Sequence, residues 1–182
     1  MRTVIVYESM FGSTRRVAQS MAEGFGPGAD VRVVRVADAG PEVLEGADLL
    51  VVGGPTHFHG MSRPASRKRA PGYAAKPESG LVLEPGADTG PGVREWMAGL
   101  TPRPLHAVAF DTRFDGLAPF TGRASKAIAR RLRKLGMHMV SGPESFLVGK
   151  KGQPLPGECD RARAFGARLA TMLARLEPSG AG

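Results

Sequence analysis

Cysteine is almost absent from this chain of 182 residues. The single cysteine, Cys159, can form neither an internal disulfide nor a metal cage built from several thiolates. Long apolar runs are missing as well, because no stretch reaches the roughly 18–20 residues that span a bilayer. Met1 and Arg2 lead directly into a Val/Ile-rich run without the features of a signal peptide. We therefore expect a cytoplasmic protein with no membrane partner.

Acidic residues are in the minority. The chain carries 25 Lys and Arg against 17 Asp and Glu, which gives a formal net charge of +8. Two stretches, 61–76 and 123–134, contain basic residues and no acidic ones. Such stretches are either solvated faces or docking surfaces for an acidic partner or an anionic substrate. The second is more typical of a solvated helix face than of a nucleic-acid-binding surface, so we expect no nucleic-acid partner.

The remaining composition is that of a globular protein with a real core, since 42% of the residues are hydrophobic. We expect one domain over residues 1–176, which contains an irregular basic loop over 61–92 and is followed by a flexible tail over 177–182. No internal repeat is visible.

Short apolar runs alternate with amphipathic segments along the chain. The apolar runs predict strands over 3–7, 31–36, 49–52, 105–110 and, broken, 138–148. The spacing of apolar residues predicts one or two helical turns over 41–46 and helices over 14–25, 93–100, 121–135 and 160–176. This alternation favours an α/β fold with a parallel sheet and helices on both faces. In such sheets the ligand binds beyond the carboxyl ends of the strands, so we expect the binding residues in the loops that follow the strands.

The loop after the first strand is Glu8-Ser-Met-Phe-Gly-Ser-Thr14. It combines hydroxyl groups with a predicted helix N-terminus, which offers unpaired N–H groups to an anion. It has no lysine and does not have the spacing of a nucleoside-triphosphate P-loop. The pattern favours a monophosphate held by dipoles and by Ser9, Ser13 and Thr14. The alternative is that Ser13 or Thr14 only caps the helix.

Two further loops follow the third and fourth strands. Gly53-Gly-Pro-Thr-His-Phe-His-Gly60 contains His57 and His59, but no carboxylate or third histidine is visibly paired with them, so we expect no metal site. Phe110-Asp-Thr-Arg-Phe114 carries two charged residues. Asp111 either contacts a ligand or ends the strand as a turn-forming residue.

Ser9-Met-Phe-Gly-Ser-Thr14 resembles the phosphate-binding pattern of flavodoxins, Ser/Thr-x-Thr-Gly-x-Thr directly after the first strand. Phe11 departs from that pattern where a hydroxyl is usual. The loop over 53–60 is similar to the family's loop around the flavin ring, and 110–114 stands where a second ring-covering loop often has a tyrosine. The resemblance runs from Thr3 to about Leu176, except for about 63–91.

The resemblance implies a flavodoxin-like doubly wound sheet of five parallel strands in the order 2-1-3-4-5, with flavin mononucleotide (FMN) as cofactor. It implies that Thr56 and the amides after it address the ring nitrogens, while His57, Phe58 or Phe114 covers the ring. Asp111 would accept a hydrogen bond from the pyrimidine ring. The implied cofactor-binding residues are Ser9, Met10, Phe11, Gly12, Ser13, Thr14, Pro55, Thr56, His57, Phe58, His59, Gly60, Asp111, Thr112, Arg113 and Phe114.

Three functions fit these observations. The leading one is an FMN-binding redox protein that transfers electrons between a reductase and an acceptor and docks on an acidic redox partner, with no catalytic residue of its own. The second is an FMN-dependent NAD(P)H:quinone-type oxidoreductase whose basic 61–76 loop recognises a nucleotide phosphate. The third is a flavin-free interaction module with a basic surface.

Overall fold

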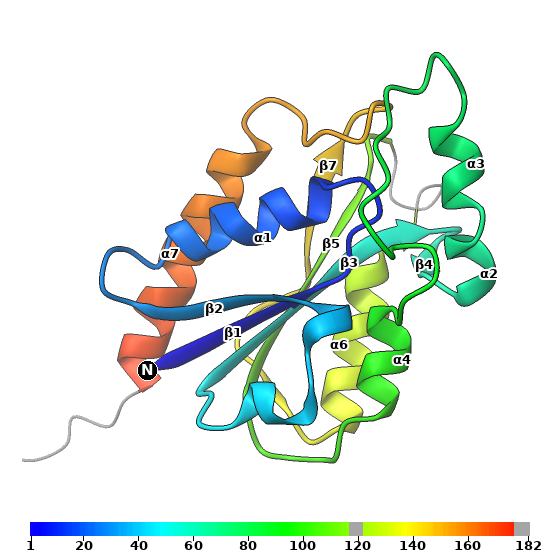
Figure 1. Cartoon of the computed structure of the whole chain (residues 1–182). Helices are drawn as coiled ribbons and strands as arrows, with labels where there is room; N and C mark the ends of the chain where they lie inside the picture. Colours follow the sequence, from blue (N-terminus) through cyan, green and yellow to red (C-terminus); the bar gives the residue numbers. More distant parts are fainter. Residues whose placement is uncertain (117–121, 177–182) are drawn as a thin grey trace, which may run out of the picture.

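The computed structural model describes residues 1–116 and 122–176 and has the predicted alternation of strands and helices (Figure 1). Its strands are β1 (Arg2–Tyr7), β2 (Asp30–Arg35), β3 (Leu49–His57), β4 (Gly60–Met61), β5 (His106–Phe114), β6 (His138–Met139) and β7 (Glu144–Val148). Its helices are α1 (Ser13–Glu23), α2 (Pro64–Arg67), α3 (Ala70–Ala74), α4 (Val93–Ala98), α6 (Ala124–Lys134) and α7 (Glu158–Leu176), with 3-10 turns at Val36–Asp38 and Pro41–Leu44. The predicted start of a helix at Thr121 and the predicted tail 177–182 lie outside the described residues.

The sheet is parallel along its main path, in the order β2-β1-β3-β5, and both β6 and β7 pair in parallel with β5. The predicted order 2-1-3-4-5 is confirmed, because the broken fifth strand of the prediction is the pair β6 and β7. Tyr7 stands opposite Gly53, and Gly53 stands opposite Phe110. The carboxyl ends of the three central strands therefore meet at one edge.

Side chains alternate between two buried clusters, one on each face of the sheet. Ile5, Val51 and Val108 point to the face that α1 and α7 cover. Val6, Val52 and Ala109 point to the face that α4 and α6 cover (Figure 1). Central strands that are buried on both faces need apolar residues at every position, which explains their unbroken apolar runs.

Helices α1 and α7 pack closely because a glycine stands at their contact. A Cβ on Gly166 would lie 1.9 Å from the carbonyl oxygen of Met21, well inside contact distance. The absence of a side chain there lets the two backbones approach. The long helix α7 thus holds α1, and with it the loop that precedes α1, against the sheet.

Two strands are longer than predicted. The third was expected to stop at Val52, yet β3 continues through Gly53-Gly-Pro55 to His57. The fourth was expected to stop at Phe110, yet β5 continues to Phe114. The reason is tertiary pairing, because β7 pairs with the second half of β5 and β5 in turn pairs with the extension of β3.

The predicted irregular segment 61–92 contains local structure. It begins in the short strand β4, which pairs antiparallel with β3, and it includes the short helices α2 and α3. Figure 1 shows this segment beyond the carboxyl end of β3. Among the described residues, no helix is both long and apolar enough to cross a membrane.

Candidate functional site

A cavity of about 610 Å³ opens at the carboxyl edge of the sheet, and we call it the edge cavity. All the predicted binding residues line it except Gly12, Gly60 and Asp111. Residues 9–11 come from the loop after β1 and residues 13–14 from the start of α1. Residues 55–59 come from the end of β3 and the turn after it, and residues 112–114 from the end of β5. The parallel register brings together three segments that are far apart in the sequence.

The loop after β1 directs unpaired N–H groups toward the edge. Gly12 precedes α1 with a φ of 87°, a left-handed conformation that favours glycine. No side chain caps this helix among the described residues, and the N–H groups of Ser13, Thr14 and Arg15 have no acceptor in that part of the chain. A helix start in this state is suited to an anion.

The three hydroxyl groups of this loop have different partners. Ser9 Oγ accepts a hydrogen bond from Gly12 N at 3.0 Å, which leaves its own hydrogen available. Ser13 Oγ donates to the carbonyl of Gly152 at 2.8 Å, so the structure uses it to tie down the loop after β7. Thr14 Oγ1 and Thr112 Oγ1 share one hydrogen bond of 2.8 Å, and one hydroxyl hydrogen of this pair stays available.

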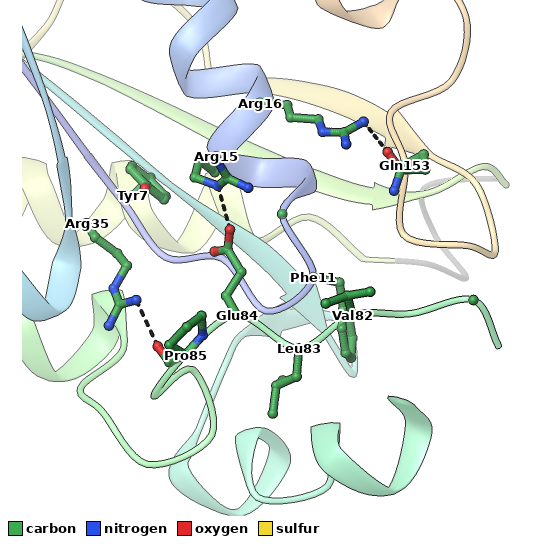
Figure 2. A pocket seen from close by; sticks show the side chains of 12 residues that line it. Tyr7, Phe11, Arg15, Arg16, Arg35, Val82, Leu83, Glu84, Pro85 and Gln153 are labelled. Atoms are coloured by element: carbon green, nitrogen blue, oxygen red, sulfur yellow. Dashed lines mark hydrogen bonds and ion pairs between the residues drawn. The ribbon is translucent and has the colours of Figure 1, made fainter. Parts of the chain in front are cut away.

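A segment over residues 80–85 crosses the loop after β1 and fixes it from outside (Figure 2). Glu84 N donates to the carbonyl of Met10 at 2.8 Å, and Arg15 Nε contacts Glu84 Oε1 at 2.5 Å. Figure 2 shows Arg35 reaching the carbonyl of Pro85, a bond of 2.8 Å. Arg15 is thus neutralised by Glu84, and the loop keeps its N–H groups as its main attraction for an anion.

The turn between β3 and β4 is strained. Phe58 and His59 have φ values of 43° and 71°, although neither is glycine. A two-residue hairpin turn of type I′ requires positive φ at both central positions, for which Asn-Gly is the favoured pair. Strain of this kind persists only where the surrounding structure imposes it, and it concentrates at functional sites. His59 also forms a bridge with Gly122, which holds the turn against the chain before α6.

His57 lies at the start of this turn and is largely buried. Its Nδ1 lies 3.1 Å from Ser66 Oγ on α2. Burial, and then the nearby charge of Arg67, lower the pKa of His57 from 6.5 to about 4. The imidazole is therefore neutral at neutral pH. No group of three or more His, Cys, Asp or Glu side chains in the described residues could hold a metal ion.

Asp111 does not face the edge cavity. It is 0% exposed, and its Oδ2 accepts a hydrogen bond from Ser125 N at 2.7 Å in the first turn of α6. Oδ2 of Asp111 is therefore engaged by helix α6, and its contact with a ring N–H stays a prediction. The cause is strand alternation, because Asp111 belongs to the same face as Ala109, whereas Thr112 points toward α1.

Several residues of the edge cavity are not among those predicted from the sequence. Lys150 and Gly152 follow β7, so the rule of examining the residues after each strand could have found them. Tyr73 and Lys76 come from α3 and the residues after it, where nothing in the sequence fixed their position. Tyr73 supplies an aromatic side chain next to the cavity, which the sequence reading had missed.

Every exposed large aromatic side chain in the described residues lines the edge cavity. These side chains are Phe58, Tyr73 and Phe114, with exposed fractions of 68%, 45% and 57%. Covering an exposed aromatic ring lowers the free energy of the system. Three exposed aromatic rings around one cavity therefore mark a binding surface for a flat apolar ligand.

A buried polar network lies below the cavity, next to the end of β1. Glu8 is 3% exposed, and its Oε2 accepts a hydrogen bond from Val93 N at 2.9 Å. Burial raises the pKa of Glu8 above its ordinary value. Arg67 Nη1 contacts Ser62 Oγ and Glu95 Oε2, both at 3.0 Å. This network fastens α2 and α4 to the end of the sheet.

Comparison with known proteins adds a sequence match and a fold match. The family model "Flavodoxin" matches residues 5–68, which contain the loops after β1 and β3. A flavodoxin from the domain Archaea superposes with a TM-score of 0.67 at 19% identity, over 96% of this chain and 99% of that one. The chain has a flavodoxin-like fold.

Other solved structures share the fold of this flavodoxin-like chain. Oxidised flavodoxin 2 from Bacillus cereus superposes with a TM-score of 0.61 at 14% identity, over 96% of this chain and 99% of that one. The Flv1 flavodiiron core from Synechocystis sp. PCC6803 gives a TM-score of 0.61 at 15% identity, over 97% of this chain and 37% of that one. A comparison with curated protein sequences gives no significant match.

Proposed function

We propose that this chain binds FMN in the edge cavity and transfers electrons between an acidic reductase and an acceptor. The observation that carries the proposal is the pairing of two features in one cavity. A helix start with unpaired N–H groups lies at one part of its wall, and the exposed aromatic side chains lie at others. A ligand with a phosphate and a flat ring system satisfies both features.

The donor set of the loop after β1 fits a phosphate group. The N–H groups of Ser13, Thr14 and Arg15 are supported by the free hydroxyl hydrogen of Ser9 and by one hydrogen of the Thr14–Thr112 pair. Hydrogen bonds to a charged oxygen are stronger than those between neutral groups. Phe11 adds no hydroxyl, but the backbone groups of its loop remain.

The other walls of the edge cavity fit a planar ring. Phe58, Tyr73 and Phe114 offer aromatic faces, while Pro55 and Thr56 bring the backbone of β3 to the same cavity. Thr56 Oγ1 accepts a hydrogen bond from Ala124 N at 2.9 Å, so its side chain anchors α6, while its hydroxyl hydrogen and its backbone remain for a ligand. Bound FMN supplies one- and two-electron redox chemistry.

The charge of the chain supports an acidic redox partner. The net charge is +8, and complementary charge raises the rate at which two proteins meet. Lys76 and Lys150 line the edge cavity itself, so the positive charge reaches the place where electrons would leave or enter.

A visible absorption spectrum, taken before and after incubation with FMN and desalting, tests the proposal. We expect retained bands of oxidised flavin. A protein that stays colourless after reconstitution would contradict the proposal and favour the basic interaction module. With flavin bound, steady NAD(P)H consumption in the presence of a quinone and without a separate reductase would identify the quinone-type oxidoreductase instead.

A further inference from the structure

A second pocket, of about 400 Å³, adjoins the edge cavity and is lined by Arg63, Arg69 and Arg94. We call it the arginine pocket. It shares His57, Phe58 and Ser66 with the edge cavity, so the strained turn after β3 forms a wall of both. None of the described residues that line it is acidic.

The three arginines keep their charge unneutralised. Arg94 is held by two main-chain carbonyls, because its Nε donates to Ser62 and its Nη2 to Met61, each at 3.1 Å. Carbonyl groups orient a guanidinium but carry no net charge. Arg63 and Arg69 are exposed, and within the described ranges no acidic side chain comes within 4 Å of any of the three.

A fourth arginine nearby shows the contrast. Arg67 lies on the same short helix as the pocket residues Ala65 and Ser66, but it is buried and paired with Glu95 at 3.0 Å. The carboxylate of Glu95 therefore balances the charge of the buried Arg67. The arginines that reach the pocket have no such compensation, and their combined field acts on whatever enters it.

The form of the pocket favours a small ligand with concentrated negative charge. Guanidinium groups donate several hydrogen bonds in a planar fork that matches phosphate oxygens. The guanidinium carbon of Arg69 lies 5.7 Å from the ring centre of Phe58, so a cation and an aromatic face stand together at one wall. A planar base or ring can stack on either group.

We propose that the arginine pocket binds the phosphate group of a small phosphorylated molecule, with a nucleotide as the preferred carrier. Its position beside the edge cavity would bring such a molecule next to the flavin, so its role as an electron donor rests on the proposed function. Binding of a phosphate group in the arginine pocket does not rest on the proposed function, because the charged side chains of this pocket come from outside the loop after β1.

Isothermal titration calorimetry at low ionic strength, with 2′,5′-ADP, inorganic phosphate and adenosine as probes, tests the proposal. The protein is titrated both alone and with excess FMN, which occupies any phosphate site in the edge cavity. We expect 2′,5′-ADP to bind in both cases and adenosine to bind at least tenfold more weakly. Tighter binding of 2′,5′-ADP than of inorganic phosphate supports a nucleotide site, and equal binding supports a site for free phosphate.

The variant Arg63→Gln/Arg69→Gln locates the binding. We expect this variant to bind 2′,5′-ADP about tenfold or more weakly, because the loss of a hydrogen bond to a charged group lowers binding affinity by about tenfold or more. The control Lys126→Gln/Arg130→Gln makes the same change of charge on exposed positions of α6 and should change the affinity less than about twofold.

The inference would be overturned if the wild-type protein bound neither 2′,5′-ADP nor inorganic phosphate. It would also be overturned if the Arg63/Arg69 variant kept the wild-type affinity, or if adenosine bound as tightly as 2′,5′-ADP. Circular dichroism of both variants checks that they fold. The absorption spectrum with FMN is a separate readout, so failure of the flavin proposal is distinguishable from failure of the arginine pocket.

Discussion

Ser9 and Ser13 stand in the same loop, yet the structure uses their hydroxyl groups differently. Ser9 accepts a hydrogen bond from Gly12 and keeps its hydrogen, whereas Ser13 donates its hydrogen to Gly152. We expect Ser9→Ala to weaken FMN binding by about 1–3 kcal/mol, because a charged phosphate oxygen loses a donor. Fluorescence titration of the apoprotein with FMN measures the change.

Ser13→Ala is the matched control for this prediction. It should cost stability of about 1 kcal/mol through the lost contact with Gly152 and change FMN affinity by less than about threefold. Equal losses of FMN affinity in the two variants would show that the distinction between the two hydroxyl groups is wrong.

His57 makes the stability of the protein depend on pH. Burial lowers its pKa in the folded state from 6.5 to about 4. As the pH falls from about 6.5 toward 4, the unfolded chain binds a proton that the folded protein does not. The contribution of neutral His57 to the free energy of unfolding is therefore complete above pH 6.5. It is lost on acidification, and the free energy of unfolding falls by up to about 3 kcal/mol.

Urea unfolding of the wild type and of His57→Gln at several pH values between 7 and 4 tests this expectation. The variant should lose less stability on acidification than the wild type. Glu8, whose pKa burial raises, acts in the opposite direction but is present in both proteins, so the difference isolates His57. Parallel pH profiles would refute the assignment.

At the scale of elements, the turn between β3 and β4 carries residues that its backbone disfavours. Phe58 and His59 both have positive φ. Replacing the pair with Asn-Gly relieves a cost of about 1–2 kcal/mol per residue, so we expect the variant to be about 1 kcal/mol more stable. It also removes the aromatic ring of Phe58, and we expect weaker FMN binding.

Thermal unfolding together with FMN titration measures the two effects. The single variant His59→Gly is the control, since it relieves one strained position and keeps the ring. A double variant that is less stable than the wild type would show that the turn is not strained. Unchanged FMN affinity would show that Phe58 does not contact the flavin.

Element types were predictable from local patterns, but their ends were not. Apolar runs located every strand of the main sheet, and apolar spacing located α1, α4, α6 and α7. The extension of β5 to Phe114 depends on pairing with β7, which lies far along the chain. The orientation of Asp111 toward α6 was unpredictable for this reason, because a residue inside a strand must follow its alternation and a residue in a loop need not.

At the scale of the whole molecule, the chain is strongly basic. Its net charge is +8, and Lys76 and Lys150 line the edge cavity. Reduction adds negative charge to a flavin, so nearby cations favour the reduced form. We expect the second reduction potential of bound FMN to be less negative than in an acidic flavodoxin.

Spectroelectrochemical titration measures this potential. Lys150→Gln should make it more negative by on the order of tens of mV, while Lys126→Gln on the exposed face of α6 should leave it nearly unchanged. A strongly negative potential in the wild type, or equal effects of the two variants, would contradict the electrostatic argument.

The sequence by itself determined the order of the elements, the parallel sheet and the loops that meet at its edge. These follow from periodicity and from the handedness of crossovers, which are local properties. Only the tertiary structure decided that Tyr73 and Lys76 join the edge cavity, that Ser13 is engaged by Gly152, and that three arginines share a second pocket. Such contacts join residues distant in the chain, and they depend on packing that no local pattern encodes.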